Sequence, residues 1–128
     1  MVTLYLNARP GRSTLSKEVK DTRGTKHKFE KEIKVPGLSL KEICERYFLR
    51  KVNLLIVDVE GFGGQVLEGN DWNNPLCRPE VIIAEDNILN KVANAPDLKK
   101  MLPKHGYVYV TGMAITENAV FVLKEMKD

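Results

Sequence analysis

The chain has 128 residues, which suits a single domain with a modest hydrophobic core. Hydrophobic residues make up 43% of the sequence and charged residues 29%, the balance of an ordinary globular protein without biased tracts. The formal net charge is only +3 and both signs are mixed along the chain, which argues against a nucleic-acid partner because such proteins gather basic residues on one face.

The sequence also bears on the compartment. We expect no secretory signal and no membrane contact, because the first residues lack a charged-then-apolar pattern and no apolar run is long enough to span a bilayer. Cys44 and Cys77 lie far apart without metal-type spacing and suggest no disulfide framework. These features predict a cytoplasmic protein.

The first 37 residues predict a pair of strands around a polar loop. Val2–Asn7 alternates β-branched and aromatic residues, as a strand does. Residues 12–31 are polar and lack periodicity, so we expect a loop with at most one helical turn. Residues 32–35 form a short strand candidate. The basic stretch 23–34 is interrupted by acidic residues, which favours a solvated loop or hairpin over a phosphate site.

The clearest predicted helix follows Ser39. Ser39 is a good N-cap, and Glu42 stands three residues later, as a capping box requires. Apolar residues then recur at helical spacing on one face: Leu40, Ile43, Cys44, Tyr47 and Phe48. This face indicates core packing, so Cys44 is interpreted as a small buried hydrophobe rather than a nucleophile.

Two near-continuous apolar runs follow, at residues 53–59 and 80–85. Continuous runs are typical of parallel strands that are covered on both faces. Between them, residues 65–68 predict a short helix that Gly69 closes.

The last third of the chain predicts a helix and a closing hairpin. Pro96 suits the first position of a helix, for which Leu98, Met101 and Leu102 would supply an inward stripe. Residues 107–111 and 119–123 predict two antiparallel strands. Because strands and helices alternate before this hairpin, we expect a three-layer α/β architecture with right-handed crossovers.

Acidic residues follow both apolar runs, at the position where open α/β sheets bind ligands. Asp58 and Glu60 end the first run, and Glu85 and Asp86 end the second. Carboxylates gathered at such an edge bind a divalent cation, accept hydrogen bonds from a hydroxylated substrate, or act as a general base. The alternative is that Asp58 and Glu60 only stabilise the amino end of the next helix. Delivery of acids by two strands favours a functional site.

Three closely spaced glycines, Gly61, Gly63 and Gly64, raise the alternative of a nucleotide loop. Their spacing differs from the dinucleotide motif, and the neighbouring acids would repel a phosphate, so this alternative is the weaker one. Elsewhere, His105 follows a predicted helix end, where a cationic ring is electrostatically favoured. Trp72 is expected to anchor its loop rather than to stack on a substrate.

In their order and spacing, these features resemble the C-terminal half of the FkbM methyltransferase domain. The similarity lies in VPGLSLKEICERYFLRKVNLLIVDVEGFGGQVLEG, RPEVIIAED and HGYVYVTGMAITENAVFVLK. That family has a capped helix, a strand ending in Asp-x-Glu-Gly, a helix ending in Leu-x-Gly, a strand ending in Glu, and a hairpin with Gly-Tyr and Asn. The matching positions are Leu40, Ile43, Asp58, Glu60, Gly61, Val66, Leu67, Gly69, Glu85, Gly106, Tyr107 and Asn118.

The resemblance implies a fold and an activity. It implies a partial Rossmann-like sheet of the class I methyltransferase type, closed by an antiparallel hairpin. Residues 1–37 would be an N-terminal insert and residues 38–128 half of the methyltransferase fold. It further implies S-adenosylmethionine as cofactor and methyl transfer to a hydroxyl oxygen of a sugar or other small metabolite.

The resemblance also assigns roles to residues. Asp58, Glu60 and Glu85 become the catalytic candidates, and Asp58 and Gly61 become the residues that contact the cofactor. Two positions depart from the family. The glycine-rich cofactor segment Gly-Ala-Asn-x-Gly does not occur in the sequence and would precede its first residue. Gly63 stands where the family often has a further Glu.

The same resemblance predicts an exposed sheet edge. The strand at residues 53–59 is central in the family's sheet and would lie at the edge here, where it would tend to pair with another chain. We therefore expect a homodimer, or complementation by a separately encoded N-terminal half. Two alternatives to a methyltransferase remain at this point: a non-catalytic oligomerising or ligand-binding module, and a small acid-lined metal site.

Overall fold

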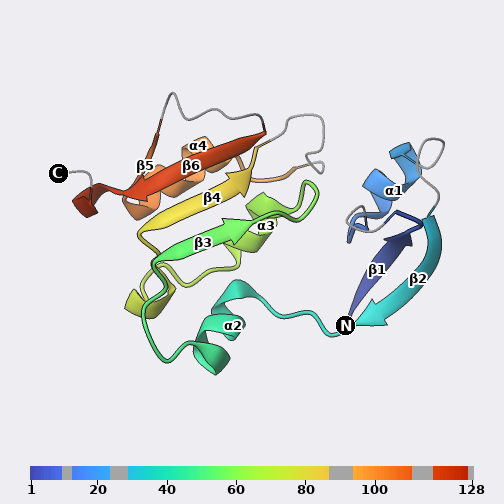
Figure 1. Cartoon of the computed structure of the whole chain (residues 1–128), viewed down its shortest axis with the longest axis horizontal. Coiled ribbons are helices and arrows are strands. Elements are labelled where there is room, and N and C mark those ends of the chain that lie inside the picture. Colours follow the sequence, from blue (N-terminus) through green and yellow to red (C-terminus); the bar gives the residue numbers. More distant parts are fainter. Residues whose placement is uncertain (10–12, 24–28, 87–93, 111–116, 127–128) are drawn as a thin grey trace.

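A computed structural model of the chain describes residues 1–9, 13–23, 29–86, 94–110 and 117–126. It contains a two-stranded sheet and a separate four-stranded sheet with the strand order β3-β4-β6-β5. Figure 1 shows the two sheets at opposite ends of the molecule, joined by the extended segment that leads into α2. Among the described residues, no helix is long and apolar enough to cross a bilayer.

The two-stranded sheet pairs β1 (Val2–Asn7) with β2 (Phe29–Val35) in antiparallel register. Between them lies α1 (Lys17–Arg23), which is longer than the single turn predicted. Strand β2 also begins earlier than predicted, because its first residues alternate in charge and show no hydrophobic pattern. Their strand conformation comes from pairing with β1, in which Leu6 lies opposite Lys31.

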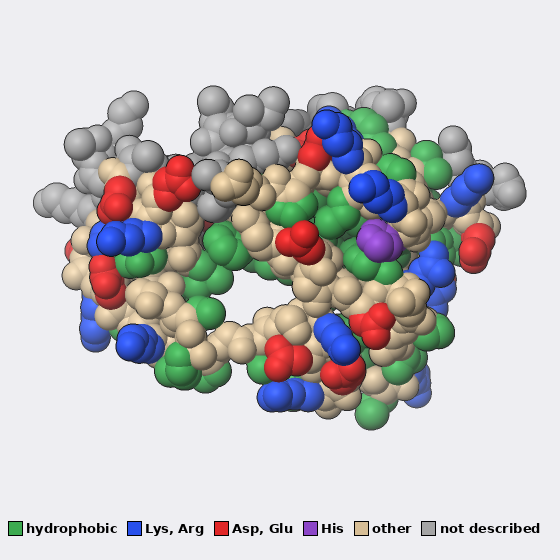
Figure 2. Space-filling view, turned by 180° about the vertical axis from the view of Figure 1, so that it is seen from behind, with side chains coloured by type: hydrophobic (Ala, Val, Ile, Leu, Met, Phe, Trp, Pro, Cys, Tyr) green, Lys and Arg blue, Asp and Glu red, His purple; other side chains and the backbone are tan. Residues whose placement is uncertain are grey.

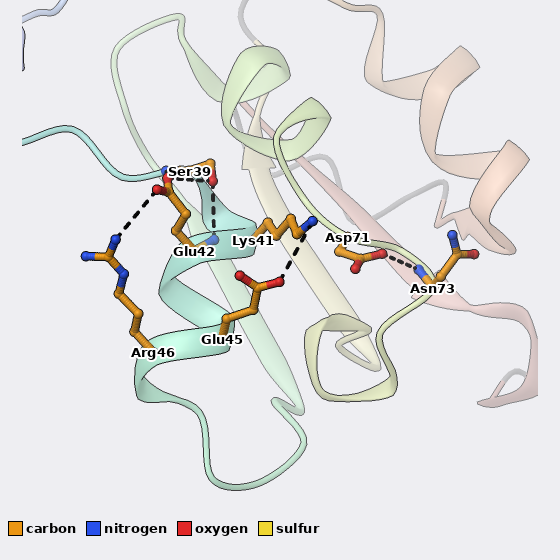
Figure 3. Close-up of polar contacts among 7 residues, drawn as sticks. All are labelled: Ser39, Lys41, Glu42, Glu45, Arg46, Asp71 and Asn73. Carbon is orange, nitrogen blue, oxygen red and sulfur yellow. Dashed lines mark hydrogen bonds and ion pairs between the residues drawn. The ribbon is translucent and has the colours of Figure 1, made fainter.

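Helix α2 (Leu40–Tyr47) begins where the sequence predicts, because its capping box forms. The Ser39 hydroxyl accepts a hydrogen bond from the Glu42 N–H at 3.2 Å, and the Glu42 carboxylate accepts one from the Ser39 N–H at 2.8 Å (Figure 3). On the exposed side, two ion pairs at 3.8 Å each join residues four positions apart: Lys41–Glu45 and Arg46–Glu42. Cys44 faces the core and is buried, as expected.

The four-stranded sheet is mixed. Strands β3 (Leu54–Val57) and β4 (Val81–Glu85) are parallel, as the two apolar runs predict. Strand β6 (Asn118–Leu123) pairs antiparallel with both β4 and β5 (Tyr107–Tyr109), so the predicted antiparallel pair is confirmed. Position 111, the predicted end of the first of these strands, lies outside the described residues. Strand β3 lies at the edge of this sheet, as the family resemblance predicts.

The helices α3 (Gly63–Glu68) and α4 (Leu98–Met101) both lie on one face of this sheet, behind the strands in Figure 1. Short 3₁₀ helices complete the described elements: η1 (Pro75–Cys77), η3 (Leu102–His105) and η4 (Lys124–Met126). The core between helices and strands consists of Val57, Leu67, Ile82, Ala84, Leu98, Leu102, Tyr107, Ala119, Phe121 and Leu123. Around the four-stranded sheet, the described residues thus form two layers, and the predicted third layer is not found among them.

Helix α4 begins later than predicted. Asp97 is the N-cap, and its side chain accepts a hydrogen bond from the Lys99 N–H at 3.0 Å, so Pro96 precedes the helix instead of opening it. The chain then tightens into η3, which contains Pro103, and this 3₁₀ helix ends at Gly106, whose φ is 89°. The inward stripe is confirmed: Leu98 and Leu102 are buried and Met101 is partly buried.

Figure 1 shows none of the described helices on the other face of the four-stranded sheet. The strand register aligns two rows across it: Leu54, Val81 and Val122, then Ile56, Ile83 and Val120. Leu54 is 51% exposed and Ile56 is 62% exposed. The prediction that the first apolar run is covered on both faces is therefore wrong for β3, which has a strand on one side and described helices on one face only.

Candidate functional site

The predicted acidic residues emerge at the carboxyl ends of β3 and β4. The parallel register places Val57 opposite Ala84. Asp58 and Glu85 follow these two residues, so both lie at the carboxyl ends of the strands, at the same end of the sheet. On its other side, Glu85 lies opposite Asn118 of β6. We call this end of the sheet the acidic rim; it consists of Asp58, Glu60, Gly61, Glu85 and Asn118.

Glu85 is hydrogen-bonded to the loop that follows β3. Its Oε2 accepts a hydrogen bond from the backbone N–H of Gly61 at 3.1 Å. Gly61 is buried, and Glu85 is half-buried. Because a buried N–H without a partner is costly, this contact fixes the loop against the end of β4.

The loop turns through two residues with a left-handed backbone. The φ of Glu60 is 48° and that of Gly61 is 89°, and the Phe62 N–H donates to the Val59 carbonyl at 3.2 Å. Positive φ at both central residues is the pattern of a type I′ turn. Gly61 adopts this conformation freely, whereas Glu60 does so at a cost of roughly 1–2 kcal/mol. Backbone strain of this kind concentrates at ligand-binding and catalytic positions.

The remaining glycines allow close packing. A Cβ on Gly64 would lie 2.8 Å from the carbonyl oxygen of Pro96, so only glycine fits between α3 and the segment before α4. A Cβ on Gly63 would find its nearest neighbour, the Glu85 carbonyl oxygen, at 3.7 Å. Since Glu85 occupies the Gly61 N–H, this geometry gives the nucleotide-loop alternative no support.

A basic residue without a local sequence signal lies beside the acidic rim. Lys99 Nζ is 3.3 Å from Asp86 Oδ2 and 4.7 Å from the centre of the Tyr109 ring. The hydrogen bond and the charge of Asp86 raise the pKa of Lys99, so it stays cationic. The Asp86 N–H donates to the Glu117 carbonyl at 2.7 Å. Lys99 had no local signal, because its position depends on how α4 packs.

The acidic rim does not have the geometry of a metal centre. Within the parts of the chain that the structure describes, no three His, Cys, Asp or Glu side chains are grouped so that they could hold a metal ion. Asp58 is exposed, Glu60 is half-buried, and Glu85 is bonded to the backbone. The alternative of an acid-lined metal site therefore gains no support.

An aromatic cluster lies near the amino end of β4, away from the acidic rim. Trp72 stacks on His105 with ring centres 4.9 Å apart and meets the edge of Tyr107 at 5.6 Å, so its role as a loop anchor is confirmed. The Tyr107 hydroxyl donates to the Pro79 carbonyl at 2.7 Å. Burial, followed by the charge of Arg78, lowers the pKa of His105, so the expectation of a favoured cationic ring is wrong.

A family model described as the methyltransferase FkbM domain matches residues 1–109. The chain belongs to the FkbM methyltransferase family. The match includes all four predicted site residues (Asp58, Glu60, Gly61 and Glu85) and ends before β6. No curated protein and no solved structure matches the chain.

Proposed function

We propose that this chain supplies the carboxylate-bearing part of an FkbM methyltransferase site, in which S-adenosylmethionine donates a methyl group to a hydroxyl oxygen of a sugar or other small metabolite. Membership of the family supports methyl transfer. The observation that carries the assignment of residues is that Asp58 and Glu85 follow neighbouring strands at the same end of the sheet, where Glu85 also accepts a hydrogen bond from the Gly61 N–H.

The acidic rim suits the chemistry of a hydroxyl acceptor. Methyl transfer needs an aligned nucleophile and loss of the hydroxyl proton. We assign Asp58, which is exposed at the rim, to accept that proton. Glu60 would accept hydrogen bonds from other hydroxyl groups of the methyl acceptor. Glu85 is a positioning residue, because its carboxylate holds the turn that carries Glu60.

The residues present fit one part of the cofactor. S-adenosylmethionine carries a cationic sulfonium and an ammonium group, both of which suit an edge that bears Asp58 and Glu60. Gly61 also permits close backbone approach. The family's Gly-Ala-Asn-x-Gly segment does not occur in residues 1–128, so these residues do not account for the whole cofactor. When bound, the cofactor supplies the methyl group, and this chain positions the acceptor and takes its proton.

Calorimetric titration with S-adenosylmethionine tests this proposal, with the chain alone and then mixed with an FkbM N-terminal half that carries the glycine-rich segment. We expect binding heat in at least the mixture. Asp58→Asn should bind about tenfold more weakly, the loss of roughly one charge-assisted hydrogen bond. Glu68→Gln, an exposed change on α3, is the matched control. Absence of heat in both wild-type experiments would reject the proposal.

The exposed edge of the sheet favours a second candidate, an oligomerising or ligand-binding module without catalysis. Edge strands are usually protected from pairing by charged residues or proline. Residues 53–57, which include β3, contain neither. Leu54 and Ile56 are exposed there. We propose that β3 pairs with a strand of another protein, either a second copy of this chain or a separate N-terminal half.

Sedimentation at micromolar concentration tests this pairing. A dimer of the pure chain supports the second copy, and a monomer that associates with an N-terminal half supports complementation. Ile56→Lys should abolish either association, whereas Leu49→Lys, at a 95% exposed position outside β3, should leave it unchanged. A compact monomer that binds neither partner argues against both forms.

We also propose a reducing compartment such as the cytoplasm. Cys44 and Cys77 are free thiols, and free thiols persist in a reducing environment. The test is to add a cell-permeant alkylating reagent before lysis, to unfold the protein in the presence of that reagent, and to measure its mass. Both cysteines should then be alkylated. A disulfide already present in the cell would contradict this assignment.

A further inference from the structure

Cys44 and Cys77 are distant in sequence and adjacent in the fold. Cys44 lies on α2, Cys77 ends η1, and each is 2% exposed. The Cys77 thiol lies close enough to Cys44 to shift its pKa. Both line one small cavity of about 10 Å³, which is no larger than a single water molecule needs.

The backbone on either side of this thiol pair is held in place. The Asn70 side-chain amide donates to the Cys77 carbonyl at 2.8 Å, and the Phe48 N–H donates to the Cys44 carbonyl at 3.1 Å. The pair is therefore part of a packed contact between α2 and η1, with Phe48 and Asn70 among the residues that line the same cavity.

The environment of the pair suppresses ordinary thiol chemistry. Burial, followed by the interaction with Cys77, raises the pKa of Cys44 to about 12. Since the thiolate is the reactive form, attack on bulky reagents is slow in the folded chain. A thiol that does become oxidised, however, already has its partner in contact.

We propose that Cys44 and Cys77 are a modification site, which forms an intramolecular disulfide when the protein meets a two-electron oxidant such as hydrogen peroxide. One sulfur attacks the peroxide, the O–O bond breaks, and a sulfenic acid and water form. The second sulfur then attacks the sulfenic sulfur, the S–S bond forms and a second water leaves. Overall, two thiols are oxidised, one peroxide is reduced, and two waters are released.

The disulfide would enclose the part of the candidate site that follows β3. The stretch of chain between the two cysteines contains β3, the turn at Glu60 and Gly61, and α3. Closing this loop covalently lowers the conformational entropy of the unfolded chain, so the oxidised protein should unfold at a higher temperature. Because both thiols are buried, oxidation requires transient opening of α2, a helix of eight residues.

Mass spectrometry of the full chain tests the proposal after incubation with hydrogen peroxide under native conditions, followed by unfolding and alkylation. The expected product is a monomer about 2 Da lighter, with no alkylated thiol, and dithiothreitol should restore two alkylatable thiols. Its melting temperature should exceed that of the reduced chain. In the Cys44→Ala and Cys77→Ala variants no intramolecular disulfide can form, so the mass should not fall by 2 Da. The remaining thiol should either gain oxygen or stay open to alkylation.

The wild-type measurement decides the matter even if a variant fails to fold. Two thiols that remain alkylatable, a gain of oxygen atoms without loss of two hydrogens, or disulfides only between chains would each overturn the proposal. So would a disulfide that forms only when urea unfolds the chain before oxidation.

Discussion

The carboxylate of Glu85 accepts a hydrogen bond from the backbone N–H of Gly61 at 3.1 Å. This contact joins the end of β4 to the turn after β3. It also sets the position of Glu60, whose left-handed backbone precedes Gly61 in the same turn. The acidic rim is therefore a connected structure, and its stability is open to direct test.

Replacement of Glu85 by Ala should lower the free energy of unfolding by about 1–3 kcal/mol, because the buried Gly61 N–H loses its acceptor. Glu85→Gln should cost less, since its amide oxygen still accepts. Urea denaturation measures both. Glu68→Ala, exposed on α3, should stay within about 0.5 kcal/mol of wild type. An Ala variant at position 85 that is no less stable than this control would show that the contact contributes nothing.

Gly64 and Gly63 form a matched pair for the packing of α3. Gly64→Ala should destabilise the fold by roughly 1–3 kcal/mol, because the new Cβ would meet the Pro96 carbonyl oxygen at 2.8 Å. Gly63→Ala, with its nearest contact at 3.7 Å, should change stability by less than about 1 kcal/mol. Thermal unfolding followed by circular dichroism compares them. Equal losses at the two positions would contradict the close approach of Pro96.

Glu60 should show a conflict between stability and function. Its φ of 48° favours glycine, so Glu60→Gly should be at least as stable as wild type, whereas Glu60→Val should be less stable by about 1–2 kcal/mol. If Glu60 binds the acceptor as proposed, the Gly variant should lose ligand binding despite its stability. Denaturation and calorimetry on the same samples separate the two effects. Equal stability of the Val and Gly variants would mean that the turn carries no strain.

Stability should fall in strong alkali because of Tyr107. Burial raises the pKa of Tyr107 to about 12, and its hydroxyl donates to the Pro79 carbonyl at 2.7 Å. An unfolded tyrosine has a pKa of about 10. The folded state therefore favours the neutral phenol, and this stabilisation is complete below pH 10 and disappears between roughly pH 10 and 12.

Melting temperatures from pH 8 to 12 measure this dependence, and absorbance of the phenolate follows the ionisation directly. Tyr107→Phe cannot ionise, so its melting temperature should fall less steeply above pH 10. Parallel curves for the two proteins would place the cause of the alkaline instability elsewhere.

Helix α2 was predictable because its signals are local. The capping box joins Ser39 to Glu42 within a single turn, and one face of the helix is apolar. The start of β2 was not predictable, because Glu30 and Lys31 show no apolar pattern and become a strand only through pairing with β1. Lys99 was missed for a similar reason, since its partner Asp86 lies beyond the end of another element.

By itself, the sequence determined the family, the order of the main helices and strands, and the placement of acids after two parallel strands. These properties depend on neighbours along the chain. Only the tertiary structure decided that Cys44 meets Cys77, that Gly64 packs against Pro96, and that Ile56 is left exposed at a sheet edge. Each depends on how distant segments pack, and packing free energy is a property of the assembled fold rather than of any local segment.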